Sequence, residues 1–384
     1  MELYIHIPFC RKKCSYCSFT SFTDKEAFFE TYIDLILTEA SLRIDEAEEL
    51  FTTVYIGGGT PSLLPPRLFR KLLSGLKEIY DFHDVAEYSS EANPGTVTEE
   101  WLETAASQGI NRLSFGMQAH QQKLLTILGR IHHTDEVEHS VMLARRAGIS
   151  NINLDLIFGI PTQSITDWIE TLETALSFSP CHISAYGLIP EEGTPLFRKL
   201  QNKQMQLPDT DTERDMYETA VRILRKHGLQ RYEISNFAAC GYECLHNIGY
   251  WSQIPYIGLG VSAASMTGCH IRPDGMTYHR RTNPNNLAAY MKMIEQKAAP
   301  SCDLISPKEA RFETLMLGLR LTQGISEDSF FKRHSVSLEQ CYGRKLHTLA
   351  EAGLMLHEGN TWRLTDRGFD IQNSILVELM DEPV

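Results

Sequence analysis

Three cysteines lie close together near the start of the chain. Cys10, Cys14 and Cys17 are spaced CxxxCxxC and follow an apolar run at residues 3–7. Thiolates are soft ligands for zinc, copper(I) and iron–sulfur clusters, so these side chains can reach one inorganic centre. A structural zinc site normally takes a fourth Cys or His, and the nearby His6 lies within the predicted strand. A 4Fe–4S cluster held by three thiolates leaves one iron open to a ligand, and we expect this cysteine triad to hold such a cluster.

The residues around the triad resemble a known cluster loop. YIHIPFCRKKCSYC (residues 4–17) is similar to the loop of the radical S-adenosylmethionine enzymes, whose signature has an aromatic residue before the third cysteine, here Tyr16. The resemblance implies that the open iron binds the amino and carboxylate groups of S-adenosylmethionine. It also implies that an electron from the cluster breaks the sulfonium C–S bond, which gives methionine and a 5′-deoxyadenosyl radical. The cofactors carry that chemistry, while the protein positions them and excludes water.

A glycine-rich turn, GGGTP at residues 57–61, follows the predicted strand TVYI. Such a turn alone is a weak signal, because a tight connection between a strand and a helix also needs glycine. Here it stands at the carboxyl end of the second strand, the end at which barrel enzymes assemble their sites. The resemblance implies that this turn holds the methionine end of S-adenosylmethionine. The residues carried over are Gly58, Gly59 and Thr60 for that contact, with Tyr4 and Tyr16 near the cluster.

Polar side chains follow further strands of the pattern. They are Glu91, Gln118, Arg130 and Asp155, each at a strand end or in an adjoining loop. Each one alone could be a surface or hydrogen-bonded residue, but four in succession at one face favour a shared pocket. The resemblance implies that their counterparts contact the amino group, ribose or carboxylate of S-adenosylmethionine. It implies more loosely that Gly187 or Ala185 touches the adenine.

Strands and helices alternate along the first half of the chain. The predicted strands cover residues 3–7, 53–57, 86–92, 112–117, 152–159 and 182–189. The predicted helices cover residues 25–43, 65–80, 98–108, 120–147 and 164–178. This alternation indicates parallel strands with right-handed crossovers, and six such units predict an α/β fold with a barrel or a partial barrel. The resemblance implies the partial (β/α)6 barrel of the radical S-adenosylmethionine enzymes.

The remaining chain predicts a smaller unit. A helix at 209–228 and a strand at 231–235 extend the pattern, and helical spacing resumes at 309–321 after a polar stretch at 268–286. Residues 345–371 predict a helix, two short strands and a helix, a C-terminal α+β, winged-helix-like domain that packs without DNA affinity. We expect a core barrel at 1–235, a connecting segment at 236–300 and a C-terminal domain at 301–384.

Composition restricts the function classes. Lys+Arg 36 against Asp+Glu 49 gives a formal charge of -13, which argues against a surface that follows nucleic-acid phosphates. The start of the sequence lacks the pattern of a secretory signal, and no run of apolar residues is long enough to span a bilayer, so we expect a cytoplasmic protein. Nine cysteines without a secretory signal favour metal binding or buried thiols over a disulfide framework.

Over residues 1 to about 375 the chain resembles the oxygen-independent coproporphyrinogen III oxidase group, which implies that the C-terminal domain at 301–384 is of the HemN type. The oxidases, which decarboxylate their substrate in haem synthesis, carry a fourth cysteine two residues after the cluster loop, where this chain has Phe19, and a longer segment before the cluster. Both differences match the related branch of haem chaperones (HemW). HNIGYW at residues 246–251 matches that branch's HNxxYW motif, which implies that His246 takes part in haem binding. Tyr250 and Trp251 then offer flat surface to the macrocycle.

Two further groups of side chains have alternative interpretations. Cys240, Cys244 and His246 suggest a second metal site or thiolates for haem, but no fourth ligand is evident nearby. Arg280 and Arg281 suggest partners for haem propionates, although the pattern favours a solvated surface pair.

Three functional hypotheses follow from the sequence. The first is a chaperone that binds haem and delivers it to acceptor apo-haemoproteins, with a 4Fe–4S cluster and S-adenosylmethionine in a supporting role and an external electron donor. The alternatives are a coproporphyrinogen III oxidase, an activity that we do not expect, and a module with a structural zinc. Nucleic acid is not an expected partner. The resemblance leaves open a homodimer and transient membrane association during delivery, although no basic amphipathic helix supports the latter.

Overall fold

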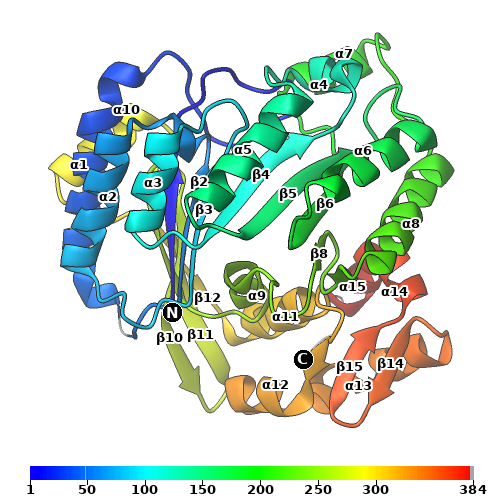
Figure 1. The fold of residues 1–384 in the computed structure, drawn as a ribbon. Coiled ribbons are helices and arrows are strands. Elements are labelled where there is room, and N and C mark those ends of the chain that lie inside the picture. The colour runs from blue at the N-terminus through cyan, green and yellow to red at the C-terminus, as the bar shows by residue number, and fades with distance from the viewer. Residues whose placement is uncertain (48, 381–384) are drawn as a thin grey trace.

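Parallel strands run in chain order through the centre of the molecule (Figure 1). The structure is a computed structural model that describes residues 1–47 and 49–380. The parallel strands are β1 (Glu2–Ile7), β2 (Thr53–Gly58), β3 (Glu87–Ala92), β4 (Arg112–Gln118), β5 (Asn151–Phe158) and β6 (His182–Gly187). Each pairs with the next in parallel register, so the predicted partial (β/α)6 barrel is confirmed.

Both edges of the parallel sheet are extended by later strands. They are β7 (Gln230–Arg231), β8 (Asn236–Ala238), β9 (Tyr256–Leu259), β10 (Ala264–Arg272), β11 (Gly275–Thr282) and β12 (Ser301–Ile305). At one edge, β8 pairs antiparallel with β6 and β7 pairs antiparallel with β8. At the other edge, β9 lies parallel to β1, and β10 to β12 continue antiparallel beyond it. Among the described residues, these strands make a twelve-stranded sheet in which β1 and β6 do not pair, so the barrel stays open.

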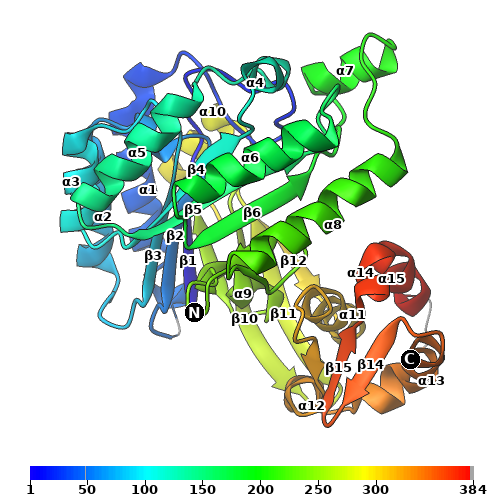
Figure 2. The same cartoon turned by 45° about the vertical axis from the view of Figure 1, so that its right-hand side comes forward.

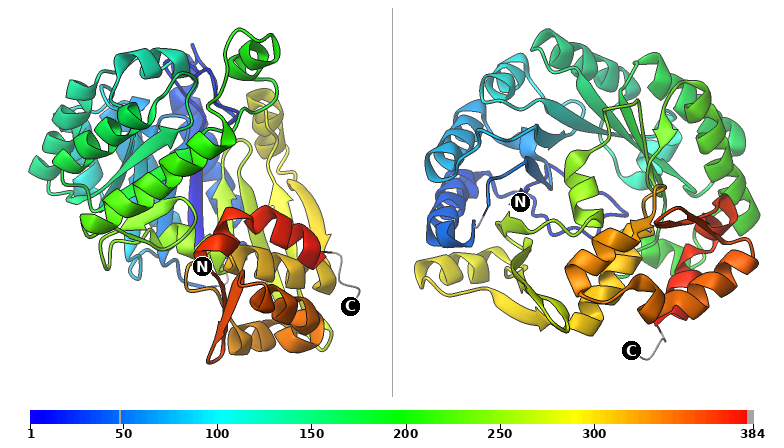
Figure 3. Two further views of the ribbon diagram at one scale, coloured as in Figure 1. Left: turned by 90° about the vertical axis from the view of Figure 1, so that its right-hand side faces the viewer. Right: turned by 90° about the horizontal axis from the view of Figure 1, so that it is seen from below.

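Helices cover the outer face of the sheet (Figures 1 and 2). Those of the barrel half are α1 (Phe29–Leu42), α2 (Pro66–Ile79), α3 (Glu99–Ser107), α4 (Gln122–Leu128), α5 (Thr134–Arg146), α6 (Ile165–Ser177), α7 (Pro195–Gln201), α8 (Thr210–Lys226) and α10 (Leu287–Glu295). The short helix α9 (Leu245–Trp251) lies inside their ring instead (Figure 3). Short 3-10 turns lie at η1 (Glu26–Phe28), η2 (Ile44–Glu46) and η3 (Pro61–Leu63). The apolar faces of most of these helices and the outward side chains of the strands form one large core, while α4 and α7 share a separate smaller cluster.

The two faces of each barrel strand differ in chemistry. On β1, Leu3 and Ile5 are fully buried in the core beneath the helices. Tyr4 and His6, which have the opposite parity, are hydrogen-bonded to each other through the Tyr4 hydroxyl and His6 Nδ1 at 2.9 Å. Because successive side chains on a strand point to opposite faces, the even-numbered residues of β1 point into the barrel, and its interior is polar.

The C-terminal unit has its own core. Its elements are α11 (Pro307–Gly318), β13 (Ile325–Ser326), α12 (Glu327–His334), α13 (Leu338–Glu351), β14 (Met355–Glu358), β15 (Thr361–Leu364), α14 (Asp366–Asp370) and α15 (Gln372–Met380). The three strands pair in the order β13-β15-β14, and Trp362 is buried among the helices. This confirms the predicted helix, two strands and helix at 345–371. The unit is held to the barrel by ion pairs between Arg231 and Asp366 at 2.6 Å and between Arg214 and Asp370 at 2.8 Å.

Two predicted elements are wrong in detail. The helix predicted at 120–147 is two helices, α4 and α5, because Gly129 takes a left-handed conformation with φ of 76° that ends α4. The strand predicted at 231–235 is a turn between β7 and β8, in which Glu233 accepts a hydrogen bond from the Ser235 backbone N–H at 2.8 Å. The three-part division of the chain stays a prediction, and its last four residues, 381–384, lie outside the described part.

Candidate functional site

The loop that carries the cysteine triad is fixed at the carboxyl end of β1. The backbone N–H of Cys10 donates to the Phe22 carbonyl at 3.0 Å, which closes the base of the loop. At its centre, the Ser15 N–H donates to the Leu128 carbonyl at the end of α4, and the Ser15 carbonyl accepts from the Leu196 N–H at the start of α7. α4 and α7 lie at the same end of the barrel as this loop (Figure 1). Two helix ends therefore hold the three cysteines in place.

Each cysteine of the triad is a free, partly buried thiol. The Thr60 hydroxyl lies 3.6 Å from Cys10 Sγ, and Arg130 Nη1 lies 3.6 Å from Cys14 Sγ. Burial raises the pKa of the Cys10 and Cys17 thiols, so binding of iron would release their protons. The guanidinium of Arg130 offers positive charge to the thiolate form beside it.

The triad opens onto a cavity of about 420 Å³ at the carboxyl ends of the barrel strands. This volume lies within the range for small-molecule sites. Most of the residues predicted to bind the cluster or S-adenosylmethionine line this cavity. They are Cys10, Cys14, Tyr16, Cys17, Gly58, Gly59, Glu91, Gln118, Arg130 and Asp155.

Two other predicted residues lie beside the cavity. Thr60 lines an adjoining small pocket with Asn93 and Arg130. Tyr4 lies deeper in the barrel, where its hydroxyl hydrogen-bonds to His6 and its ring stacks on Tyr55 with centroids 6.3 Å apart. Tyr4 therefore supports the floor below the cavity.

The glycine-rich turn approaches the base of the cluster loop so closely that side chains would not fit. A Cβ on Gly59 would lie 2.7 Å from the Phe9 carbonyl oxygen. Gly58 has φ of 110°, and a Cβ there would lie 2.4 Å from the His6 ring. These glycines let the turn reach the loop, and the Gly58 N–H faces the cavity and donates to Glu91 at 3.0 Å.

Two carboxylates stand in the cavity wall. Glu91 accepts hydrogen bonds from the Gly58 N–H at 3.0 Å and from the Tyr55 hydroxyl at 3.1 Å, and burial together with the charge of Asp155 raises its pKa to about 7. Asp155 accepts from the Ser114 hydroxyl at 2.8 Å, and burial raises its pKa as well. Two buried carboxylates that repel each other favour a cationic ligand between them.

Arg130 links the carboxylate wall to the cluster loop. Its Nη2 donates to the Asn93 side chain and to the Gly116 carbonyl, both at 2.8 Å, while Nη1 points to Cys14. Tyr16 packs against the apolar residues under α4 and α7, including Leu128. The cavity thus presents the cysteine thiols, the Arg130 cation beside them, and the carboxylates of Glu91 and Asp155 next to the glycine turn.

The cluster and the cofactor that the sequence resemblance implies fit these residues. Among the described residues, no three His, Cys, Asp or Glu side chains lie close enough to hold a single metal ion. A 4Fe–4S cluster does not need such a group, because each thiolate of the triad binds a different iron. S-adenosylmethionine carries an ammonium and a sulfonium, which suit the carboxylate wall. The residues named above would hold both groups in one site.

Several cavity residues were not predicted from the sequence. They are Tyr55, Asn93, Ser114, Gly116 and Tyr186. Of the two residues that the resemblance loosely implies for the adenine, Gly187 lines the cavity, whereas Ala185 is buried in the core. Tyr55, Ser114 and Tyr186 have the interior parity of their strands. The sequence signal for these residues is alternation: along each strand, polar or aromatic residues at every second position are separated by apolar residues.

The HNIGYW motif lies at the opposite end of the barrel. It forms α9, whose N-terminus is capped by Glu87 at the start of β3, with the Leu245 N–H donating to Glu87 at 2.9 Å. From below, α9 is the yellow-green helix inside the ring of outer helices (Figure 3). A carboxylate at this helix end is favoured by the unpaired N–H groups and the dipole. α9 therefore closes the amino-terminal end of the barrel.

His246 is buried within this plug and has partners on both ring nitrogens. Nδ1 hydrogen-bonds to the Thr53 hydroxyl at 2.7 Å and Nε2 to the Tyr250 hydroxyl at 3.0 Å. Burial, with the nearby Arg112 charge, lowers its pKa to about 3, so the ring is neutral. A neutral imidazole can ligate iron, but here Nε2 becomes available only when the Tyr250 hydroxyl moves away.

The remaining sequence candidates lie apart from the cavity. Cys244 is buried with its thiol 3.4 Å from Glu87, while Cys240 is exposed. Arg280 is paired with Glu313 at 2.6 Å, and Arg281 is paired with Glu46. These residues do not converge on a shared metal or propionate site in the described chain.

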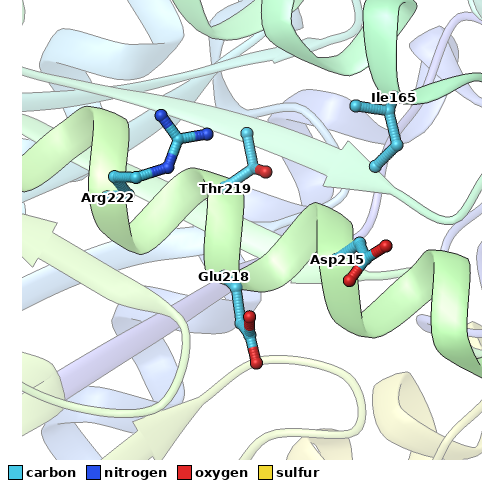
Figure 4. Close-up of a pocket in the computed structure, with 5 residues that line it drawn as sticks. All are labelled: Ile165, Asp215, Glu218, Thr219 and Arg222. Carbon is cyan, nitrogen blue, oxygen red and sulfur yellow. The ribbon is translucent and has the colours of Figure 1, made fainter.

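A separate hollow lies on the outer surface between α6 and α8. It has a volume of about 300 Å³, and Figure 4 shows Asp215, Glu218, Thr219 and Arg222 along α8 with Ile165 at the start of α6. It contains none of the predicted site residues and is remote from the cysteine triad. Within the described chain, no helix combines the length and the apolar character needed to cross a bilayer.

Two protein-family models match the chain. The model of the Radical SAM superfamily matches residues 4–175, which include the cysteine triad and the carboxylate wall. The model of the HemN C-terminal domain matches residues 305–371.

Curated relatives match almost the whole chain. Heme chaperone HemW of Bacillus subtilis (strain 168) is 33% identical over 99% of this chain and 99% of its own. Heme chaperone HemW of Escherichia coli (strain K12) is 32% identical over 98% of this chain and 97% of its own. A solved structure, the coproporphyrinogen III oxidase HemN from Escherichia coli, described as a radical SAM enzyme, superposes with a TM-score of 0.83. It covers 99% of this chain and 90% of its own at 22% identity, and at that identity it establishes the shared fold.

Proposed function

This chain belongs to the heme chaperone HemW family of radical S-adenosylmethionine proteins, and on that basis we propose that it binds haem and delivers it to acceptor haemoproteins. The observation that carries the proposal is the match to curated haem chaperones over nearly the full length of both chains. Its cofactors are a 4Fe–4S cluster and S-adenosylmethionine, and haem is its cargo.

The cavity supplies places for both cofactors. We assign the cluster to the cysteine triad and S-adenosylmethionine to the carboxylate wall and glycine turn, with Tyr16, Thr60, Gln118 and Arg130 around them. When bound, the cluster supplies an electron and an open iron site. The chain's own residues fix the thiols through two helix ends, neutralise the ligand's positive charge at Glu91 and Asp155, and exclude water by their burial.

Phe19 supports the chaperone over the oxidase alternative. It occupies the place where the resembled oxidases carry a fourth cysteine, and its side chain is 66% exposed at the cavity. The oxidase structure shares the fold but only 22% of the sequence, and a shared fold does not establish a shared reaction.

The experiment is a pair of assays on one anaerobically reconstituted sample. Haemin is titrated while the Soret band is recorded, and coproporphyrinogen III is incubated with S-adenosylmethionine and a reductant. The proposal expects saturable haem binding and no decarboxylated product. Multiple turnovers of coproporphyrinogen III would restore the oxidase, and absence of saturable haem binding would remove the chaperone.

The axial ligand of the haem iron remains to be tested. His246 stays the residue that we propose from the HNxxYW motif, on the condition that Tyr250 releases Nε2. An electron donor for the cluster is a further expected partner. A cytoplasmic location, a homodimer and transient membrane contact remain proposals that follow from the sequence alone.

A further inference from the structure

Exposed apolar side chains gather at the mouth of the cavity. Phe19 is 66% exposed and Ile189 is 71% exposed, and both line the same cavity as the cysteine triad. Tyr186 is 40% exposed, and the buried Leu188 lines the same cavity. Single exposed apolar residues are common on protein surfaces, but these come from two distant segments and converge on one opening.

Two cations stand beside this apolar surface. Lys12 and Lys13 are exposed and line the same cavity, and Lys13 Nζ donates to the Phe19 carbonyl at 3.1 Å. Glu191 is the carboxylate that lines this outer part of the cavity. In a chain with a formal charge of -13, such a pair of lysines is a local site for anionic groups. The surface, called the rim below, consists of Lys12, Lys13, Phe19, Tyr186, Leu188 and Ile189.

The inner cavity has room for one small ligand. Its volume is about 420 Å³, near the lower end of the range for such sites. S-adenosylmethionine on the carboxylate wall occupies that space, so a macrocycle as large as haem has to lie outside it. A flat apolar ring with two carboxylates at one edge matches a surface that combines apolar side chains with two lysines.

We propose that the rim is the surface on which haem docks, with the macrocycle against Phe19 and Ile189 and the propionates at Lys12 and Lys13. The inference rests on the proposed haem binding and adds a location for it. Haem docked on the rim is a state separate from the proposed complex in which His246 ligates the iron, because the rim and α9 lie at opposite ends of the barrel. His246 lies beside Glu2, at the start of β1. His6, near the other end of β1, is roughly 13 Å farther along the strand, and the rim lies beyond His6.

The location has a consequence for the second cofactor. A haem across the rim covers the opening through which S-adenosylmethionine leaves the cavity. Bound haem should therefore slow the release of S-adenosylmethionine, and the protein should hold both ligands at the same time. Haem ligated only at α9 would leave this release rate unchanged, because α9 closes the other end of the barrel.

The test compares matched substitutions in the full-length, cluster-loaded protein. Ile189→Ser and Phe19→Ser each remove apolar surface from the rim, and Lys12→Glu with Lys13→Glu reverses its charge. Ile271→Ser is the control, because Ile271 is 62% exposed on β10, toward the opposite end of the sheet. Iron content confirms that each variant keeps its cluster.

Haemin titration followed by the Soret band should give a Kd about tenfold higher for each rim variant, equivalent to ~1.4 kcal/mol, and an unchanged Kd for Ile271→Ser. Metal-free protoporphyrin IX, measured by fluorescence, should bind the wild type and lose affinity in the same variants, since the rim contacts the ring and propionates. Dissociation of labelled S-adenosylmethionine should slow at least fivefold in the presence of haem.

The outcomes separate the two proposals. If the wild type shows no saturable haem binding, the proposed function fails. If the wild type binds haem and the rim variants bind it with the wild-type Kd, the docking surface is wrong while the function stands. Loss of binding in His246→Ala alone, with unchanged release of S-adenosylmethionine, would move the haem to α9.

Discussion

Glu91→Gln tests whether the carboxylate wall holds S-adenosylmethionine. In the protein, Glu91 accepts hydrogen bonds from the Gly58 N–H and the Tyr55 hydroxyl. A glutamine can accept from Gly58 and donate to the Tyr55 oxygen, so both contacts survive. The substitution therefore removes one negative charge and leaves the shape of the cavity unchanged.

The expected loss follows from the burial of this group. A hydrogen bond to a charged group contributes about 1.5–3 kcal/mol, which corresponds to a Kd for S-adenosylmethionine roughly 10- to 150-fold higher. The assay is equilibrium dialysis of labelled S-adenosylmethionine against the reconstituted protein at pH 8. At this pH the wild-type carboxyl group, whose pKa is about 7, is mostly ionised.

Glu233→Gln provides the matched control. Glu233 is a buried carboxylate outside the cavity that likewise accepts from a backbone N–H, that of Ser235 at 2.8 Å. It should leave the affinity for S-adenosylmethionine unchanged. A Glu91→Gln protein with full iron content and a Kd within twofold of the wild type would refute the assignment of Glu91.

Three further predictions concern the cluster, the turn and the C-terminal unit. Replacing any cysteine of the triad by Ala should remove most of the bound iron and the visible absorption of the cluster, and full iron and sulfide in all three variants would contradict the assignment. Gly59→Ala should lower cluster occupancy after reconstitution, because its Cβ would press on the Phe9 backbone. Gly148→Ala, where a Cβ meets nothing within 4 Å and the cost is backbone strain at a φ of 92°, should keep full occupancy, and equal occupancy in both variants would count against the close approach. His334 is buried, and burial with the charges of Arg333 and Arg311 lowers its pKa to about 3. The neutral ring therefore stabilises the fold above the unfolded pKa of His334, and this stability is lost as pH falls toward 3. Between pH 7 and pH 4.5 the free energy of unfolding in urea should fall by about 2 kcal/mol more for the wild type than for His334→Gln, and equal losses in the two proteins would refute this.

The cluster loop and the strand order could be predicted from the sequence because their signals are local. The cysteine spacing lies within one loop, and each parallel strand is bounded by a helix with its own periodicity. The carboxyl ends of parallel strands meet at one face, so Glu91, Arg130 and Asp155 could be placed in a shared pocket before the structure was known. The structure brings these three residues to the cavity.

Other features depend on contacts between distant segments. His246 is buried against residues far away in the sequence, such as Thr53, which is 193 residues away along the chain. No local pattern around HNIGYW indicates that α9 closes the barrel. The rim likewise joins Phe19 to Ile189, and their approach depends on how far the open barrel curves. Tyr55 could have been found from strand parity, but parity alone does not distinguish the inner from the outer face.

The most direct test of the central claim is the transfer of haem from this protein to an apo-haemoprotein. The full-length, haem-loaded protein is mixed with increasing excess of an apo-acceptor, and the shift of the Soret band to that of the acceptor is followed by stopped flow. A chaperone that delivers its cargo through contact predicts a transfer rate that rises with acceptor concentration and exceeds the rate at which haem dissociates into a non-interacting scavenger. A rate that equals the dissociation rate at every acceptor concentration would contradict delivery.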